Sequence, residues 1–165
     1  MHIMKRIEPK PGQESVWDYP RPPRVEPASK PVKVIFNGVV IAQSSRAQRV
    51  LETSHPPTYY IPIDDIQMQY FQLTPHMSFC EFKGRASYWT ITVGNQSAIN
   101  AAWGYKNPTQ GFEAIKNHIA IYASRVDACY VGDEQVQAQP GDFYGGWITS
   151  DIVGPFKGAP GTQGW

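Results

Sequence analysis

Proline and glycine limit this chain more than any other feature of its sequence. The 165 residues include 15 prolines and 14 glycines, where average usage would give about 20 of the two together. Because neither residue is well tolerated inside a long helix, the composition favours strands and turns. Seven of the prolines lie within residues 1–31. We therefore predict a proline-rich N-terminal arm, residues 1–31, packed on one mainly β domain, residues 32–165, that includes an ordered tail rich in glycine and aromatic residues.

Charge and hydropathy exclude several classes of protein. The 15 Lys and Arg residues nearly balance the 14 Asp and Glu residues, which argues against a nucleic-acid partner bound by broad phosphate neutralisation. The longest purely aliphatic run, residues 39–42, is far shorter than the ~20 residues of a membrane helix. Residues 1–6 lack the apolar stretch of a secretory signal. We therefore expect a soluble, cytoplasmic protein with no nucleic-acid or membrane partner.

The cysteines and histidines give no metal-binding pattern. Cys80 and Cys129 are 49 positions apart, so the chain has neither a disulfide framework nor a C-x-x-C zinc knuckle. The four histidines are scattered without the spacing of metal ligands. We expect reduced thiols, no metal and no cofactor.

The clearest hairpin signal is Asn37-Gly38 between two β-branched runs, residues 32–36 and 39–42. Asn-Gly suits a type I′ turn, in which both central residues have positive φ. A two-residue turn places Val34 opposite Ile41 and keeps the apolar side chains on one face.

A second hairpin is predicted from residues 77–83 and 86–93, with Gly84-Arg85 as the turn. This register places Glu81 opposite Tyr88 and Cys80 opposite Trp89. Alternation then sorts the side chains onto two faces. The core face carries Cys80, Phe82, Trp89, Ile91 and Val93. The other, polar face carries Glu81, Lys83, Tyr88, Thr90 and Thr92.

The other segments complete a mainly β pattern. Residues 58–63 read as an edge strand, because Pro62 cannot donate to a central ladder. Residues 44–52 fit either a short helix or a kinked strand. Strands are also predicted at 97–105 and 119–122, a helical turn within 111–118, and a third hairpin at 129–131 and 134–136. We predict a mainly β fold of antiparallel hairpins.

Three motifs in the body carry a family resemblance: Glu52-Thr53-x-His55-Pro56-Pro57-Thr58-Tyr59-Tyr60-x-Pro62, Cys80-Glu81-x-Lys83-Gly84-x-Ala86-x-Tyr88-Trp89 and Ala102-Trp103-x-Tyr105. Together with residues 17–23, 139–149 and 154–158, they resemble the family called domain of unknown function 427. The resemblance covers nearly the whole chain.

The resemblance implies a β-tent-like fold: two antiparallel sheets leaning together, with one or two short helices and extended terminal segments. Methionine sulfoxide reductase B and the thalidomide-binding domain of cereblon share this architecture, and many β-tents hold a structural zinc between two C-x-x-C knuckles that this sequence lacks. The family is sometimes labelled nucleotidyltransferase-like. Such enzymes hold metal ions with acids at D-x-D spacing. Asp64 and Asp65 are adjacent, so we discount that label.

A polar cluster in the second hairpin is the first candidate site. Glu81, Lys83 and Tyr88 would form a compact group of a carboxylate, an ammonium and a phenol, able to bind a zwitterion or to perform acid–base chemistry. The alternative is a cross-strand ion pair on a solvated face, which contributes at most ~1 kcal/mol. Cys80 shares the predicted core face, where a thiol is inert.

A loop histidine and a group of aromatic residues extend this candidate site. His55 follows Glu52 by three residues and precedes two prolines, which would fix its position. Aromatic walls suit flat or cationic ligands, although core packing explains most such residues equally well. The candidate ligand-binding residues are Glu52, Tyr59, Tyr60, Tyr88, Trp89, Trp103, Tyr105 and Trp147, and the candidate catalytic residues are Glu81, His55 and Lys83.

We therefore predict a small-molecule-binding domain with an aromatic-lined pocket and a polar edge. Two alternatives stay open. The first is an enzyme acting on a small molecule with Glu81 or His55 as general base. The second is a protein-interaction module that uses the proline-rich arm, since residues 17–23 resemble a ligand for an aromatic groove. The sequence leaves the oligomeric state open.

Overall fold

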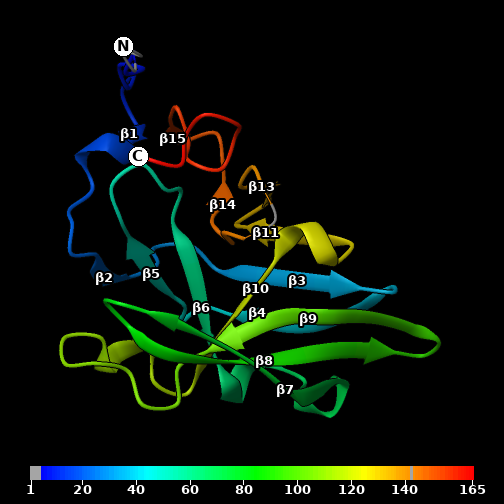
Figure 1. The fold of residues 1–165 in the computed structure, drawn as a ribbon. Coiled ribbons are helices and arrows are strands. Elements are labelled where there is room, and N and C mark those ends of the chain that lie inside the picture. Colours follow the sequence, from blue (N-terminus) through cyan, green and yellow to red (C-terminus); the bar gives the residue numbers. More distant parts are fainter. Residues whose placement is uncertain (1–4, 142) are drawn as a thin grey trace.

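The computed structural model describes residues 5–141 and 143–165, so the first four residues of the predicted arm lie outside the described part (Figure 1). The described chain is mainly β. Its helical segments are 3₁₀ turns of three residues each, in place of the one or two short helices expected: η1 (Val16–Asp18), η2 (Ile63–Asp65), η3 (Met68–Tyr70), η4 (Glu113–Ile115) and η5 (Ala123–Arg125).

The larger sheet has seven antiparallel strands in the order β2-β5-β6-β10-β9-β8-β7. In that order they are β2 (Arg24–Pro27), β5 (Gln48–Leu51), β6 (Thr58–Pro62), β10 (His118–Ile121), β9 (Gln96–Gly104), β8 (Gly84–Val93) and β7 (Phe71–Cys80). The β10–β9 pair joins the two halves of this sheet, and the long β7, β8 and β9 strands dominate the lower part of Figure 1.

The smaller sheet has four antiparallel strands in the order β12-β11-β3-β4. They are β12 (Glu134–Gln135), β11 (Ala128–Val131), β3 (Val32–Phe36) and β4 (Val39–Ser44). Apolar side chains of the two sheets form the main core, in which Val34, Ile41 and Ile61 are fully buried. The prediction of a mainly β fold based on two antiparallel sheets is confirmed.

Alternating residues of the seven-stranded sheet enter two different cores. On β10, Ile119 and Ile121 pack into the main core, whereas Ala120 joins a second core. On β6, Ile61 faces the main core and Tyr60 the second one. This period of two is that of any β-strand, and it gives the sheet one face packed against the four-stranded sheet and one face rich in tyrosine side chains. We call them the inner face and the aromatic face.

The first hairpin forms as predicted at its turn, with Phe36 paired to Val39. Its register changes farther along, because an irregularity between Val34 and Ile35 pairs Val34 with Ala42 instead of Ile41. An inserted residue of this kind is a β-bulge, which a turn signal does not reveal.

The predicted register of the second hairpin is wrong. Cys80 pairs with Gly84 and Leu73 pairs with Trp89, so the turn consists of residues 81–83. A three-residue turn shifts β7 against β8 and moves its side chains to the opposite face. Cys80 and Phe82 therefore pack against the second core, while Trp89 stays on the side of the main core.

Strand β6 lies inside the sheet between β5 and β10, so its prediction as an edge strand is also wrong. Pro62 is the last residue of β6 and precedes η2, where a missing N–H leaves the rest of the ladder intact. The ambiguous segment 44–52 is a strand, β5, over Gln48–Leu51.

The two terminal segments pair with each other and with the sheets. Strand β1 (Glu14–Ser15) runs parallel to β15 (Ile152–Val153), and the two lie side by side in Figure 1. The Trp17 indole N–H donates to the Pro155 carbonyl at 2.9 Å. A further short pair joins β13 (Gln137–Ala138) to β14 (Trp147–Ile148). Among the described residues no helix has the length and apolar character needed to cross a membrane.

Candidate functional site

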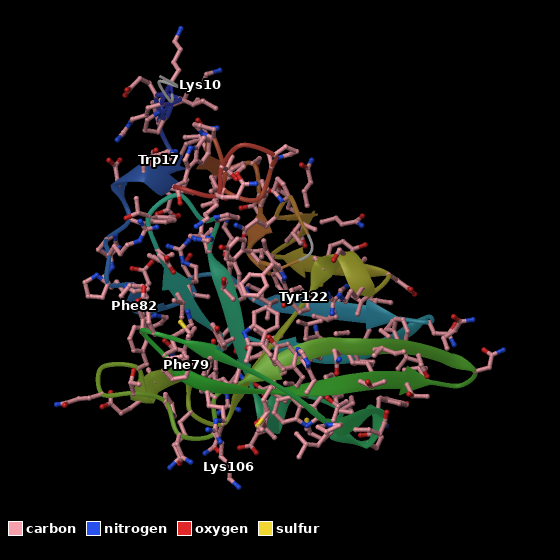
Figure 2. All side chains as sticks on the ribbon, in the orientation of Figure 1. Lys10, Trp17, Phe79, Phe82, Lys106 and Tyr122 are labelled. Atoms are coloured by element: carbon pink, nitrogen blue, oxygen red, sulfur yellow. The ribbon has the colours of Figure 1, made fainter. Side chains whose placement is uncertain are left out.

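A cavity of about 300 Å³ lies against the aromatic face of the seven-stranded sheet. Its walls come from β5 to β9, from the β7–β8 turn and from the C-terminal tail. In Figure 2, Phe79 and Phe82 lie near the end of the β7–β8 hairpin, and Tyr122 lies nearer the middle of the molecule. Eight predicted site residues line this cavity: Glu52, His55, Tyr60, Glu81, Lys83, Tyr88, Trp103 and Tyr105.

Three predicted ligand-binding residues lie elsewhere. Tyr59 and Trp147 stack on each other with ring centroids 5.1 Å apart in the main core. The Trp147 indole N–H donates to the Ile121 carbonyl at 3.0 Å, so the polar atom of this side chain is also internally bonded. Trp89 packs against the same core. These three residues act in packing on the inner face and do not reach the cavity.

Buried aromatic rings form the floor of the cavity. The Trp103 indole N–H donates to the Tyr60 hydroxyl at 3.3 Å, and the two rings meet edge to face. Burial raises the pKa of Tyr60 and of Tyr105 far above the ordinary range, so both phenols stay protonated at neutral pH. The Tyr88 hydroxyl lies 2.9 Å from the Ser78 hydroxyl. The floor therefore offers neutral hydroxyl groups among ring faces.

The C-terminal tail covers this floor through two glycines. A Cβ atom at Gly145 would lie 2.1 Å from the Trp103 ring, and one at Gly146 would lie 2.5 Å from the Pro56 carbonyl oxygen. Only a residue without a side chain fits these approaches. The Tyr122 hydroxyl donates to the Phe143 carbonyl at 3.0 Å and fixes the tail at a further point.

One buried glutamine orients His55. The Gln139 amide oxygen accepts the Gly146 N–H at 3.0 Å, and its amide nitrogen donates to the Lys157 carbonyl at 2.9 Å. These two bonds fix which end of the amide is nitrogen. That nitrogen lies 3.0 Å from His55 Nδ1, so Nδ1 must accept. The neutral imidazole consequently carries its proton on Nε2, which lies 3.6 Å from a Glu52 carboxylate oxygen.

Burial keeps His55 neutral. It lowers the pKa of this imidazole to about 4, and the nearby positive charges of Lys157, Arg21 and Lys83 act in the same direction. At neutral pH His55 is therefore an uncharged hydrogen-bond donor through Nε2.

Four charged side chains surround the cavity. Lys83 Nζ lies 5.9 Å from the centroid of Tyr105, and Lys157 Nζ lies 5.4 Å from that of Tyr144. Glu52 lies 3.4 Å from Arg21, whereas Glu81 is exposed in the β7–β8 turn. The prediction that Glu81, Lys83 and Tyr88 share one strand face is wrong in its geometry, since Glu81 and Lys83 belong to the turn, yet all three line the same cavity.

Sequence reasoning missed the tail half of the cavity lining. Gln139, Tyr144, Gly145 and Lys157 line it, together with Tyr122 from the end of β10. His55 and Gln139 are 84 positions apart, and nothing local to either residue indicates their contact. The density of glycine and aromatic residues in the tail predicted order there, but the one tail residue assigned to the site, Trp147, lies in the main core instead.

The adjacent acids Asp64 and Asp65 lie in η2, away from the cavity. Asp65 accepts hydrogen bonds from Arg46 and Ser44, and these bonds lower its pKa. Within residues 5–141 and 143–165, no three His, Cys, Asp or Glu side chains come together as metal ligands would.

The fold and the cavity define a class: a mainly β protein in which a tail closes the aromatic face of an antiparallel sheet. Residues 24–132 match the family described as Domain of unknown function (DUF427), and this chain belongs to that family. The matched range includes the whole seven-stranded sheet and ends before the tail that covers the cavity. No curated protein matches the sequence.

Proposed function

We propose that this protein binds a small organic molecule in the cavity on the aromatic face. The observation that carries the proposal is a space of about 300 Å³ between tyrosine and tryptophan rings and a tail fixed by buried hydrogen bonds. Ligand sites in proteins are typically concave, mostly apolar, largely pre-formed and ~300–1,000 Å³ in volume. A few oriented polar groups give such sites their specificity.

The orientation of His55 supports binding over catalysis by that residue. A general base needs a free lone pair that faces the substrate. The Nδ1 lone pair of His55 is used by the Gln139 amide, and Nε2 carries a proton. Glu81, the other candidate base, is exposed in the turn at the edge of the cavity. A role in holding a ligand suits both residues better.

The arm supports an internal role over partner binding. The Trp17 indole N–H is bonded to the Pro155 carbonyl, and Tyr19 is buried against Val16, Leu51 and Ile152. A groove on another protein would have to compete for side chains that the chain itself already uses. We also propose a cytoplasmic location, which the free thiols of Cys80 and Cys129 support.

Filling the cavity tests the proposal. Cys80 is half-buried and lines the cavity, so Cys80→Phe places a ring there, whereas Cys80→Ser changes the side chain without filling the space. We expect a fragment library, followed by ligand-observed NMR, to give hits for the parent protein and for Cys80→Ser that disappear with Cys80→Phe. The proposal fails if no fragment binds the parent, or if the hits persist with Cys80→Phe in a folded protein.

A further inference from the structure

Two lysines at the cavity have no carboxylate partner among the residues that the structure describes. Lys83 and Lys157 both line it, and both place their ammonium groups over tyrosine rings, Tyr105 and Tyr144. Neither belongs to any ion pair within 4 Å in the described part of the chain. A ring face attracts a cation only weakly compared with a carboxylate, so both charges remain available to a ligand.

The two carboxylates in the described lining of the cavity, Glu52 and Glu81, do not cancel these charges. Glu52 lies 3.4 Å from the Arg21 guanidinium, so its charge is balanced by a third cation. Glu81 is exposed, and water screens an exposed charge effectively. The half-buried Lys83 and Lys157 are screened less, and among the described charged groups we therefore expect them to contribute most to the potential inside the cavity.

The imidazole of His55 lies within the influence of the same positive charges. Lys157, Arg21 and Lys83 all shift its protonation toward the neutral form, in addition to burial. The neutral form exposes only an N–H toward Glu52 and the cavity, because Gln139 occupies the other nitrogen. A donor and two ammonium groups converge on one space, and each of them prefers a negatively charged oxygen as its partner.

The other walls of the cavity favour a ligand of a particular shape. Trp103, Tyr60 and Tyr105 form a ring-lined floor, and flat ligands stack on such faces. We propose that the ligand is a small anion with a planar aromatic ring, its acidic group held between Lys83 and Lys157 and its ring against this floor. The inference rests on the proposed binding function and specifies the class of ligand.

Three probes of one shape and different charge test the inference: 2-naphthoate, 2-naphthamide and 2-naphthylmethylamine. We expect titration calorimetry on the full chain at pH 7.5 to give the tightest binding for the carboxylate, at least tenfold tighter than for the neutral amide, and no binding of the amine. Equal binding of carboxylate and amide, or preference for the amine, overturns the anionic class while leaving the cavity a binding site.

Lysine variants locate the charge effect. Lys83→Gln and Lys157→Gln should each weaken naphthoate binding about tenfold and naphthamide binding distinctly less. Lys106→Gln is the matched control, because it removes the same net charge at a site outside the cavity. Lys106 is exposed and points away from the body in Figure 2. An equal loss with Lys106→Gln overturns the assignment to the cavity lysines.

A variant at Glu81 separates an anion site from a zwitterion site. Glu81→Gln should tighten naphthoate binding about twofold, because it removes an exposed like charge near the acidic group. If the variant instead weakens the binding of both naphthoate and naphthamide, the site requires a carboxylate and the anionic class is wrong. If none of the three probes binds but library fragments do, the inference of an aromatic anion is wrong and the proposed binding function stands. If no library fragment binds either, both the inference and the proposed binding function are wrong.

Discussion

The two faces of the seven-stranded sheet are made by the same strands and packed in opposite ways. On the inner face, Ile61, Ile119 and Ile121 are fully buried against aliphatic side chains of the four-stranded sheet. On the aromatic face, Tyr60 and Trp103 meet a tail of irregular backbone, and a cavity of about 300 Å³ remains. The inner face is closed by the side chains of a second sheet, which interdigitate with it, whereas the aromatic face is covered only by the tail, and the cavity remains between them.

The difference teaches which residues set stability and which set the site. A truncated isoleucine on the inner face leaves a hole in a closely packed layer. A change on the aromatic face instead alters a hydrogen bond, a charge or the position of the tail. We therefore expect variants of the inner face to change mainly the free energy of unfolding, and variants of the aromatic face to change mainly ligand binding in the cavity.

The largest effect is expected on the inner face. Ile119→Ala should lower the free energy of unfolding by about 4 kcal/mol, since the side chain is fully buried between the sheets. Urea unfolding measures the loss. Ile99→Ala, on the same strand pair but 71% exposed, is the control and should change stability by less than about 0.5 kcal/mol. Similar losses for the two variants would contradict the close packing of the inner face.

Acid should destabilise the aromatic face through His55. The folded protein keeps this imidazole neutral down to a pKa of about 4, whereas the unfolded chain takes up the proton near 6.5. The free energy of unfolding should therefore fall as the pH falls from 6.5 to 4, by about 3 kcal/mol in total, and this contribution is fully present above pH 6.5.

His55→Asn is the matched variant, because the Asn carbonyl can accept the Gln139 amide bond without titrating. Urea unfolding at a series of pH values should show a flatter profile between pH 6.5 and 4 for this variant than for the parent. Identical profiles would show that His55 is not held neutral.

The tail should depend on its closest approach to the sheet. Gly145→Ala places a Cβ atom against the Trp103 ring, so the tail must move, at a cost of about 2 kcal/mol in unfolding free energy. The same variant should weaken fragment binding, because the tail forms a wall of the cavity. Gly164→Ala has no neighbouring atom within 4 Å of the added methyl and should change neither quantity. If a folded Gly145→Ala protein binds fragments as the parent does, the tail does not form a wall of the binding site.

The smallest effect is expected from one hydroxyl pair of the floor. Tyr88→Phe and Ser78→Ala each remove the same hydrogen bond and should each cost about 1 kcal/mol. Because they break one shared interaction, the double variant should cost little more than either single variant in urea unfolding. Fully additive losses would show that the two hydroxyls do not act on each other.

Turn residues carried most of what the sequence reveals about the fold. Asn37-Gly38 and Gly132-Asp133 join the strands they were predicted to join, because short turns with positive φ leave few alternatives. Gly84 misled the same reasoning: its φ of +104° is real, but it is the first residue of β8 and follows the turn. One misplaced turn boundary sufficed to assign Cys80 to the wrong face.

Sequence motifs predicted the part of the site that lies in three segments, residues 52–60, 80–88 and 103–105. Residues 52–60 and 80–88 supply one half of the lining, and motif reading found most of them. Gln139 and Lys157 supply part of the other half through contacts that span much of the chain. Tyr59 and Trp147 were chosen for ring chemistry alone, and only the strand register shows that they face the inner core.

The position of the tail in the chain also orders events during synthesis. All seven strands of the large sheet leave the ribosome before residues 139–157, which cover the aromatic face. Until these residues have folded onto the sheet, the aromatic face presents Tyr60 and Trp103 to the surroundings, and such a patch favours contacts with other chains.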